Sequence, residues 1–478
     1  MSVSNPITVT LLHTNDLHSD LEAAARIAAY VKDVRRRIPR ERLLLVDCGD
    51  HADRARPETE GTNGMVNLAI LKATGYEAVL PGNNEGLTFT YGELDAMYAN
   101  APFPVVCANL TLTSEGGRPA WMQPFVIIRK NGVRLGLVGL TAAFNDFYRP
   151  LGWHAADPFE TARETVERVA SQCDVFILLS HLGLAYDERL AREIPGIDLI
   201  LGAHTHHLLE RPLRIGRTFL CAAGKSGRHI GHLEIDCLPG GGVTAVRGGC
   251  VPLHDRQPDP DIVRLVAEAR EDAKRNMSRP IAWLDMPLEL HPHRESPLPV
   301  LLAVALRKRT GAEIGLTNNG QLLAGLPAGS VTREMLHAIC PSPINPCLMR
   351  IRGHVLRRAL EESLLPEFTE MPLQGFGFRG RILGTLSFDG MEVTADLRRP
   401  PYERLTEILV GGEPLDEERE YTVGTLDMFT FGAGYKGLKE GRVLRFVLPD
   451  FLRDLLAEAL NDPQAVQSCL RPRWRLES

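Results

Sequence analysis

Short apolar runs alternate with helical patterns along the first half of the chain. Runs such as ITVTLLH and LLLVDC are followed by EAAARIAAYVKDVRRR and TNGMVNLAILKAT, in which apolar residues recur every three or four positions. The short continuous runs are typical of strands buried on both faces, and the longer segments are typical of amphipathic helices. The alternation over residues 7–255 therefore predicts an α/β layered sheet.

Two further segments predict antiparallel hairpins. PFVIIRKNGVRLGLVGLT contains Asn131-Gly132, a dipeptide that favours a type I′ turn. HIGHLEIDCLPGGGVTAVRGGCVPL is expected to turn at its glycines and to close the first domain. The sheet is therefore expected to be mixed.

The pattern changes near residue 257, and at 478 residues the chain is long for one domain. In HDRQPDPDIVRLVAEAREDAKRN, prolines and acids precede an amphipathic helix. The next segments mix helical patterns, PVLLAVALRKRT and HVLRRALEES, with short strands and glycine-rich turns. We expect a first domain at residues 1–257, a linker helix at 258–280 and a smaller α+β domain at 281–478.

Polar side chains follow the predicted strands in four short motifs, HTNDLHSD, VDCGD, PGNNEG and the pair SHLG and GAHTHH. The ends of strands are where α/β sheets place their ligand sites. Two divalent metals that share one carboxylate need about this many oxygen and nitrogen donors. The candidate ligands are Asp16, His18, Asp50, Asn83, His181, His204 and His206.

Each motif alone has an ordinary structural explanation. Asp16 and His18 could belong to a turn at a strand end, and His181 could be a buried core histidine. The pair His204 and His206 is more specific, because alternate residues of a strand point to one face. The four motifs in this order favour a metal-assisted hydrolase of phosphoesters.

These motifs resemble the successive signatures of the calcineurin-like metallophosphoesterases. More narrowly, the chain resembles the two-domain 5'-nucleotidase and 2',3'-cyclic-nucleotide phosphodiesterase branch. The likeness extends into TNNGQLLAGLPAGSVTREMLHAICPSPINP and RGHVLRRALEES. The resemblance implies a four-layer αββα sandwich followed by a smaller domain of the 5'-nucleotidase type.

The resemblance also implies a ligand set for each metal. One ion would be held by Asp16, His18, Asp50 and His206, and the other by Asp50, Asn83, His181 and His204, with Asp50 as the bridge. Water bound between the ions would attack phosphorus. A ligand set of carboxylate, amide and imidazole groups without thiolate suits Mn, Zn, Fe or Co.

One departure from the family concerns catalysis. The family usually has Gly-Asn-His-Glu/Asp, with the His oriented by an Asp three residues later, whereas this chain has Asn84 and Leu87. Asparagine cannot transfer a proton at neutral pH, although its amide can donate a hydrogen bond to a phosphoryl oxygen. The candidate catalytic residues are therefore Asn84 and Glu85, with His207 as another nearby acid. A turn-capping carboxylate at Glu85 and a partly exposed His207 are the alternatives.

In the family resembled, the second domain supplies the pocket for base and ribose. Aromatic stacking stabilises a bound base by roughly 1–3 kcal/mol, so two Phe-Gly clusters could form a base slot, although these residues could equally be core. The chain departs from the family here too, with Leu323 at an arginine position and no Asp in the Gly-Ala-Gly-Tyr turn. The candidate substrate contacts are Asn318, Asn319, Gly320, Phe376, Phe378, Arg379, Phe429, Phe431 and Tyr435.

Composition limits the partners and the compartment. The formal net charge of −6 argues against nucleic-acid binding, and no segment has the roughly 18 uninterrupted apolar residues of a membrane span. The N-terminus lacks a signal-peptide pattern, and nine cysteines, an odd number, favour free thiols. We expect a cytoplasmic enzyme that acts on a small phosphoester, with no nucleic-acid or membrane partner.

Three functions remain open from the residues. The first is a two-metal phosphoesterase acting on a nucleotide in the manner of a 5'-nucleotidase. The second is a phosphodiesterase that acts on cyclic nucleotides or nucleotide-sugars. The third is a regulator that binds nucleotides with low turnover, because the usual catalytic His is Asn84.

Overall fold

The computed structural model describes residues 6–114, 116–238 and 242–477. The chain folds as two compact units that divide between Ala273 and Lys274. This division falls inside helix α9 (Pro260–Met277), within the segment that the sequence indicates as a linker.

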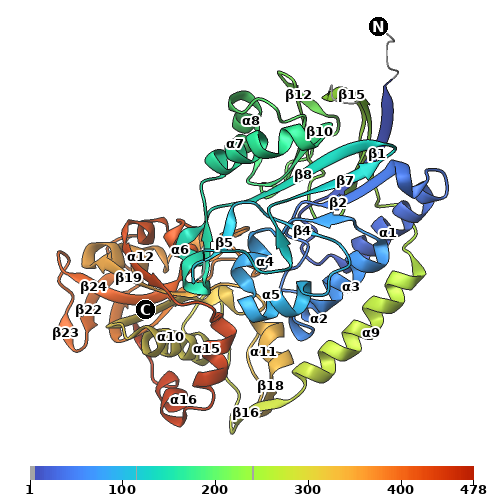
Figure 1. The fold of residues 1–478 in the computed structure, drawn as a ribbon. Coiled ribbons are helices and arrows are strands. Elements are labelled where there is room, and N and C mark those ends of the chain that lie inside the picture. The colour runs from blue at the N-terminus through green and yellow to red at the C-terminus, as the bar shows by residue number, and fades with distance from the viewer. Residues whose placement is uncertain (1–5, 115, 239–241, 478) are drawn as a thin grey trace. The chain divides into compact units, whose positions relative to one another are not determined.

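In the described part of the first unit, the strands form two main sheets (Figure 1). In order across the first sheet, the strands are β15 (Gly242–Pro252), β14 (His229–Leu238), β1 (Ile7–Thr14), β2 (Leu43–Asp47), β3 (Ala78–Val79), β4 (Val105–Val106) and β6 (Met122–Gln123). The second sheet has the order β12 (Leu213–Ile215), β13 (Thr218–Cys221), β11 (Leu199–Gly202), β10 (Val175–His181), β8 (Val133–Thr141) and β7 (Phe125–Lys130). A small separate pair joins β5 (Leu110–Leu112) to β9 (Trp153–Ala155).

The helices of this unit connect and cover the strands. Those after β1, β2 and β3 are α1 (Leu21–Arg35), α2 (Pro57–Gly61), α3 (Met65–Thr74), α4 (Asn83–Thr88) and α5 (Tyr91–Tyr98). Those of the second half are α6 (Asn145–Tyr148), α7 (Pro158–Val169) and α8 (Leu184–Glu193). Helix α3 begins three residues later than the pattern predicts, because Gly64 before it is left-handed at φ 77°.

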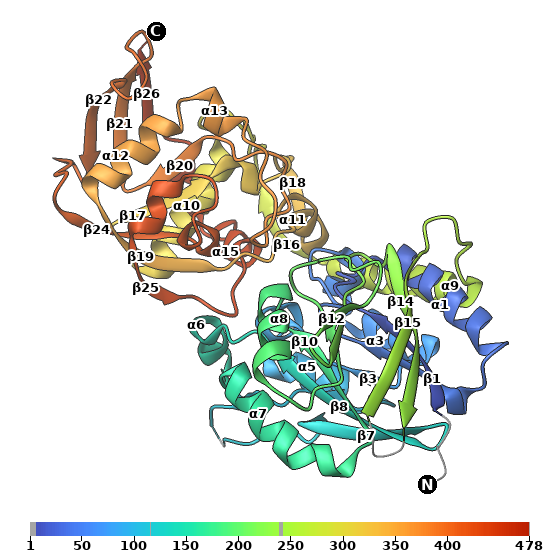
Figure 2. The ribbon, with the colours of Figure 1, turned by 90° about the horizontal axis from the view of Figure 1, so that it is seen from above.

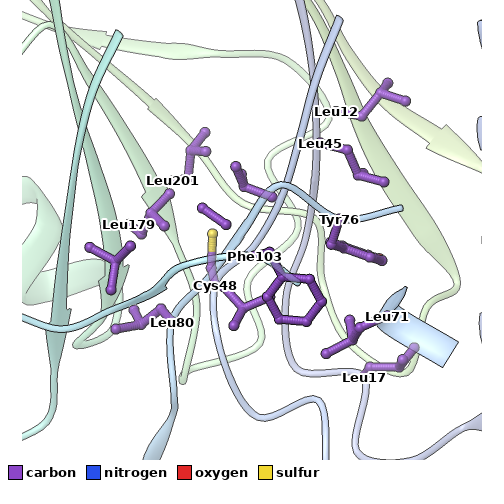
Figure 3. Packing of buried hydrophobic residues seen from close by; sticks show 14 of the residues in the cluster. Leu12, Leu17, Leu45, Cys48, Leu71, Tyr76, Leu80, Phe103, Leu179 and Leu201 are labelled. Carbon is purple, nitrogen blue, oxygen red and sulfur yellow. The ribbon is translucent and has the colours of Figure 1, made fainter. Parts of the chain in front are cut away.

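Strand β10 shows why the layers form. Ile177 and Leu179 belong to the core cluster shared with the first sheet, whereas Phe176 and Leu178 pack with residues of α7 and α8. Successive side chains of a strand point to opposite faces, so an all-apolar strand must be covered on both. Figure 2 shows α7 and α8 beside β8 and β10, and Figure 3 shows Leu179 and Leu201 among the buried side chains of the core. The predicted αββα arrangement is confirmed.

Both predicted hairpins are present. Strands β7 and β8 pair antiparallel, and the turn residues Asn131 and Gly132 have φ 51° and 85°, as a type I′ turn requires. Strands β14 and β15 also pair antiparallel. The predicted glycine turn between them lies at residues 239–241, outside the described residues.

Helix α9 packs against the first unit through its ion pairs. Lys32 Nζ lies 2.5 Å from an Asp259 carboxylate oxygen and 2.8 Å from one of Asp261, and Arg270 Nε lies 2.9 Å from Glu58 Oε1. The buried residues Ile262, Val266 and Ala269 form its apolar stripe. The amphipathic pattern of the sequence therefore corresponds to a helix whose apolar side joins the first core.

The second unit has an α+β arrangement. One sheet has the order β20 (Leu386–Asp389), β17 (Ile314–Asn318), β24 (Glu420–Leu426), β19 (Pro346–Arg352) and β25 (Arg442–Phe446). Another has the order β23 (Glu413–Pro414), β22 (Leu405–Val410), β21 (Met391–Asp396) and β26 (Trp474–Glu477), and β16 (Pro280–Leu284) pairs with β18 (Gly329–Thr332). The helices are α10 (Pro297–Thr310), α11 (Arg333–Ile339), α12 (Gly353–Glu362), α13 (Pro366–Thr369), α14 (Asp427–Thr430), α15 (Leu452–Ala459) and α16 (Pro463–Cys469).

Candidate metal centre

All seven candidate ligands lie at or just beyond the carboxyl ends of strands of the first unit. Parallel pairing of β1 with β2 and of β2 with β3 brings their ends together, and β10 pairs parallel with β11 in the second sheet. The side chains of the two sheets meet there. The residues contributed are Asp16 and His18 after β1, Asp50 after β2, Asn83 at the start of α4, His181 at the end of β10, and His204 and His206 after β11.

The backbone at this centre is strained. Five of the candidate ligands have left-handed φ angles between 48° and 71°, namely Asp16, His18, Asp50, His204 and His206. Such conformations are costly for residues other than glycine and persist where surrounding contacts impose them, often at functional sites. The contacts here are backbone hydrogen bonds, in which Asp16 N donates to Gly49 O at 2.9 Å and His18 N to Asp50 O at 2.8 Å.

The side chains converge in two groups. In one, His18 Nε2 lies 3.1 Å from His206 Nε2, and His206 Nε2 lies 3.5 Å from Asp16 Oδ1. In the other, Asn83 Oδ1 lies 2.8 Å from His204 Nδ1 and 3.1 Å from His181 Nε2. Two groups of close donor atoms could each hold a metal ion, namely Asp16 with His18 and His206, and Asp16 with Asp50 and His181.

Asp50 lies between the two groups. Its Oδ1 is 3.3 Å from His181 Nε2, and its Oδ2 is 3.9 Å from His18 Nε2. The backbone amide of Asn84 donates to Oδ1 at 2.8 Å and fixes the carboxylate. Gly82 permits the close approach, because a Cβ there would stand 2.1 Å from Asp50 Oδ1. The two oxygens thus face different histidines, as a bridging ligand requires.

The electrostatics show a centre that attracts positive charge. Burial lowers the pKa of His181, but the carboxylates of Asp50 and Asp16 outweigh it and raise that pKa to about 10. Burial raises the pKa of Asp50, but His181 and His18 outweigh it and hold the pKa below its ordinary value. The buried carboxylates of Asp16 and Asp50 therefore favour positive charge at this place.

Two imidazoles, those of His204 and His206, favour the neutral form, whereas for His18 burial is outweighed by the carboxylates of Asp53, Asp50 and Asp16, which raise its pKa. Burial lowers the pKa of His204 and of His206 to about 4. Burial raises the pKa of Asp16 to about 6. Imidazole, carboxylate and amide donors without thiolate fit divalent ions of the transition series, and binding of such ions displaces the protons from these groups.

Asn84 contacts a candidate ligand directly. Its side-chain amide is hydrogen-bonded to His18 Nδ1 at 2.9 Å, and Asp53 Oδ2 lies 3.6 Å from the same nitrogen. Groups that bond the second nitrogen of a ligating His fix the orientation of its ring. The sequence does not indicate this contact, because residues 18 and 84 belong to different motifs.

Glu85 is fully buried and joins two loops. Its carboxylate accepts hydrogen bonds from the backbone amides of Asp50 at 3.0 Å, Ala52 at 2.7 Å and Gly82 at 2.7 Å. Both of its oxygens are thus engaged by backbone amides, as in a structural clamp. His207 is exposed, and its Nδ1 is hydrogen-bonded to Thr205 Oγ1 at 2.8 Å.

Two other side chains border the centre that the sequence motifs do not include. The ring of Phe144 packs against that of His204, with centroids 5.7 Å apart. Lys225 is exposed, and its charge acts on His206. The sequence feature that indicates Lys225 is a lysine in the glycine-containing segment AAGKSG, just after a strand.

The structure separates the candidate substrate contacts of the second unit into two classes. Phe376 and Phe431 are about half exposed, and their rings face each other with centroids 6.2 Å apart and planes 17° from parallel. Arg379 is half-buried, and its Nη1 donates to Phe378 O at 3.3 Å. The remaining candidates are buried in the unit: Asn318, Asn319, Gly320, Phe378, Phe429 and Tyr435.

The buried candidates have hydrogen-bond partners within the unit. Asn318 Nδ2 donates to Leu383 O at 2.6 Å, Asn319 Nδ2 donates to His291 O at 2.8 Å, and the Tyr435 hydroxyl donates to Gly384 O at 2.7 Å. A Cβ on Gly320 would lie 1.9 Å from Ile382 O. These residues shape the unit and present little surface to a ligand.

Comparison with known proteins agrees with this geometry. Residues 9–208 match the calcineurin-like phosphoesterase family, and residues 278–440 match the 5'-nucleotidase C-terminal domain. The chain is 34% identical over 456 residues, covering 94% of its length and 98% of the relative, to the uncharacterised metallophosphoesterase YunD of Bacillus subtilis. The chain therefore belongs to the calcineurin-like metallophosphoesterases that carry a 5'-nucleotidase C-terminal domain, and it is a metal-dependent phosphoester hydrolase.

Solved structures share the fold. A 5'-nucleotidase precursor of Thermus thermophilus has a TM-score of 0.61 and 24% identity, with 98% of this chain and 99% of that one covered. The NAD nucleotidase of Haemophilus influenzae has a TM-score of 0.69 and 16% identity, with 99% and 100% covered. In the ranges that the structure describes, no helix is long and apolar enough to cross a membrane.

Proposed function

We propose that this protein hydrolyses the phosphoester of a nucleotide in the manner of a 5'-nucleotidase, with two divalent ions of Mn, Zn, Fe or Co. The observation that carries the proposal is the convergence of seven donor side chains from five strand ends. One ion would be held by Asp16, His18, Asp50 and His206. The other would be held by Asp50, Asn83, His181 and His204.

The bound ions would supply positive charge to the phosphoryl oxygens and would activate water. The chain's own residues supply the positioning. Asn84 fixes Asp50 through its backbone amide and orients His18 through its side chain. Glu85 ties the loop of Asp50 to the start of α4, so that the ligands from both keep their places.

The pair Phe376 and Phe431 supports a nucleotide as the substrate. A planar base between two rings needs about 3.5–4 Å on each side, or about 7–8 Å in all, so the 6.2 Å between these centroids would have to open by about 1–2 Å. Both rings are exposed and nearly parallel, as a base slot requires. The solved relatives named above are themselves nucleotidases by name.

Asn84 and Leu87 favour a second candidate function. Without the usual histidine acid, an ester whose leaving group needs no proton is hydrolysed most readily. Cyclic nucleotides and nucleotide-sugars are therefore the alternative substrates. If the missing histidine lowers the rate on every ester, the protein would instead be a nucleotide-binding regulator with low turnover.

A substrate screen tests these functions. The protein is loaded with each metal and assayed on 5'-monophosphates, cyclic nucleotides, nucleotide-sugars and 4-nitrophenyl phosphate. Phe376→Ala and Phe431→Ala should raise KM for nucleotides, whereas Trp283→Ala, an exposed aromatic residue elsewhere in the unit, should not. Absence of metal-dependent hydrolysis across the panel would reject the proposal.

The proposal places the enzyme in the cytoplasm. All nine cysteines lie in the described ranges and are free, and most are buried. Unpaired thiols are typical of proteins in a reducing compartment.

A further inference from the structure

The loop that carries Lys225 is bound to the metal centre on both sides. It joins β13 to β14, and its neighbouring residues Gly224 and Ser226 have φ angles of 78° and 54°. Gly224 N donates to His207 O at 3.0 Å, and Ser226 N donates to Asp16 O at 2.8 Å. Hydrogen bonds on both sides of Lys225 therefore attach its loop to the segments that carry Asp16 and His206.

The side chain of Asn15 strengthens this attachment. Its Nδ2 donates to Gly224 O at 2.7 Å and to Asp16 Oδ2 at 2.8 Å, and its Oδ1 accepts from Ala223 N at 3.0 Å. Asn15 is buried, so these bonds are protected from water. The position of Lys225 relative to Asp16 is thus fixed by several hydrogen bonds.

The ammonium of Lys225 is exposed and has no acidic partner. Among the residues that the structure describes, no carboxylate lies within 4 Å of its Nζ. The hydrogen bonds of Gly224 and Ser226, on either side of Lys225, place this residue beside the loops that carry the candidate ligands. An unpaired cation at this place is available to an anionic ligand.

The charge of the centre indicates which anion it selects. Two divalent ions with Asp16 and Asp50 would leave two positive charges, which a phosphomonoester dianion neutralises. A phosphodiester carries one negative charge and gains less from a further cation. We propose that Lys225 is a specificity-determining residue that binds a non-bridging oxygen of the scissile phosphate and favours monoesters over diesters.

This inference rests on the proposed function and is tested with a matched pair of substrates. 4-Nitrophenyl phosphate and methyl 4-nitrophenyl phosphate share a leaving group and differ in charge. Lys225→Ala should lower kcat/KM for the monoester by about 10–100-fold, the range for losing a hydrogen bond to a charged group, and should change the diester much less. Lys225→Arg should restore most of the monoester rate.

Lys72→Ala is the control, since Lys72 is an exposed lysine on α3 of the same unit, outside the centre. It should leave both rates unchanged, and metal content should be the same in all variants. Equal losses on both esters, or no loss on either, for Lys225→Ala would overturn the inference.

A binding measurement separates this inference from the proposed function. Inorganic phosphate is titrated by calorimetry into the metal-loaded wild type and Lys225→Ala, and the variant should bind at least about tenfold more weakly. Equal affinities would overturn the role of Lys225. If the wild type hydrolyses neither ester, the proposed function fails, and the phosphate titration still decides the role of Lys225.

Discussion

The side chain of Asn84 is engaged with His18, which determines what it can contribute to catalysis. An amide bonded to His18 Nδ1 at 2.9 Å orients the ring but supplies no proton to a leaving group. The rate should therefore depend steeply on leaving-group acidity, with aryl phosphates hydrolysed far faster than 5'-monophosphates. A series of substituted phenyl phosphates measures this dependence.

Restoring the family's His and Asp at positions 84 and 87 should narrow the difference in rate between aryl phosphates and 5'-monophosphates. Asn84→His with Leu87→Asp should raise the rate on poor leaving groups by roughly 10²–10⁴, the usual contribution of a positioned acid. Leu87 is partly buried against the core, so thermal unfolding must first show that the variant folds. Equal wild-type rates on both kinds of ester would show that another group donates the proton.

Asp50 is the residue whose loss should affect both metals. Its oxygens face His181 on one side and His18 on the other. Asp50→Asn removes the shared negative charge from both metal sites, so we expect loss of both ions and a large fall in activity. His206→Ala should remove mainly one ion. Metal-to-protein ratios from mass spectrometry distinguish the two results, and two ions retained with near-normal activity in Asp50→Asn would contradict the bridging role.

The buried side chain of His13 indicates that the free energy of unfolding depends on pH. It is fully buried on β1 with no hydrogen-bond partner for either ring nitrogen in the described chain, and burial lowers its pKa from 6.5 to about 4. The unfolded chain binds the proton first as pH falls, so stability is lost between about pH 6.5 and 4, by up to about 3 kcal/mol.

Urea unfolding at several pH values tests this prediction. His13→Leu should show a shallower fall in the free energy of unfolding over that window. The control His254→Leu, at a side chain with 72% exposure, should keep the wild-type slope. A wild-type slope in His13→Leu would show that other groups cause the pH dependence.

At the scale of elements, α4 and α6 are fitted to each other through Gly86 and Tyr148. Tyr148 is fully buried, and a Cβ on Gly86 would lie 2.7 Å from its Cε1. Helix α6 directly follows Phe144, whose ring packs on His204. The absence of a side chain at residue 86 thus allows the α6 segment to reach the metal centre.

Gly86→Ala should therefore destabilise the protein. The overlap costs about 1–3 kcal/mol, more than the roughly 1 kcal/mol that alanine gains in a helix. In a Tyr148→Leu background the overlap is relieved, and the same substitution should become neutral or stabilising. Gly92→Ala in α5, where a Cβ meets no atom within 4 Å, should stabilise. Additive effects of Gly86→Ala and Tyr148→Leu in denaturant unfolding would contradict this packing.

The elements also show what the sequence can predict. Apolar runs ending in Asp16, Asp50 and His181 indicate both the strands and the edge at which they meet, because burial on two faces leaves a pattern in the sequence. The contacts between Asn84 and His18, and between Gly86 and Tyr148, leave none, since each joins residues more than 60 positions apart. The Phe-Gly clusters also leave no pattern that separates exposed from buried rings. Tertiary packing places Phe376 and Phe431 at the surface and Phe378 and Phe429 in the core.

At the scale of the molecule, each unit has a core of its own. The clusters of the first unit end at Ala269, and the cluster of the second begins at Leu284. All seven candidate ligands belong to the first unit, whereas Phe376 and Phe431 belong to the second. Metal binding and base recognition are therefore assigned to different units of the proposed enzyme.

A chain of residues 1–277 tests this assignment. It keeps all of α9, whose Arg270–Glu58 ion pair and buried Ala273 lie within the first unit, so it should fold cooperatively and bind metal. It should still hydrolyse 4-nitrophenyl phosphate, but its preference for a 5'-nucleotide over ribose 5-phosphate should fall by about 5–150-fold, equivalent to roughly 1–3 kcal/mol of base stacking. The full-length Phe376→Ala, Phe431→Ala double variant should lose the same preference while keeping its metals. A truncated enzyme that still prefers nucleotides would show that the first unit itself recognises the base.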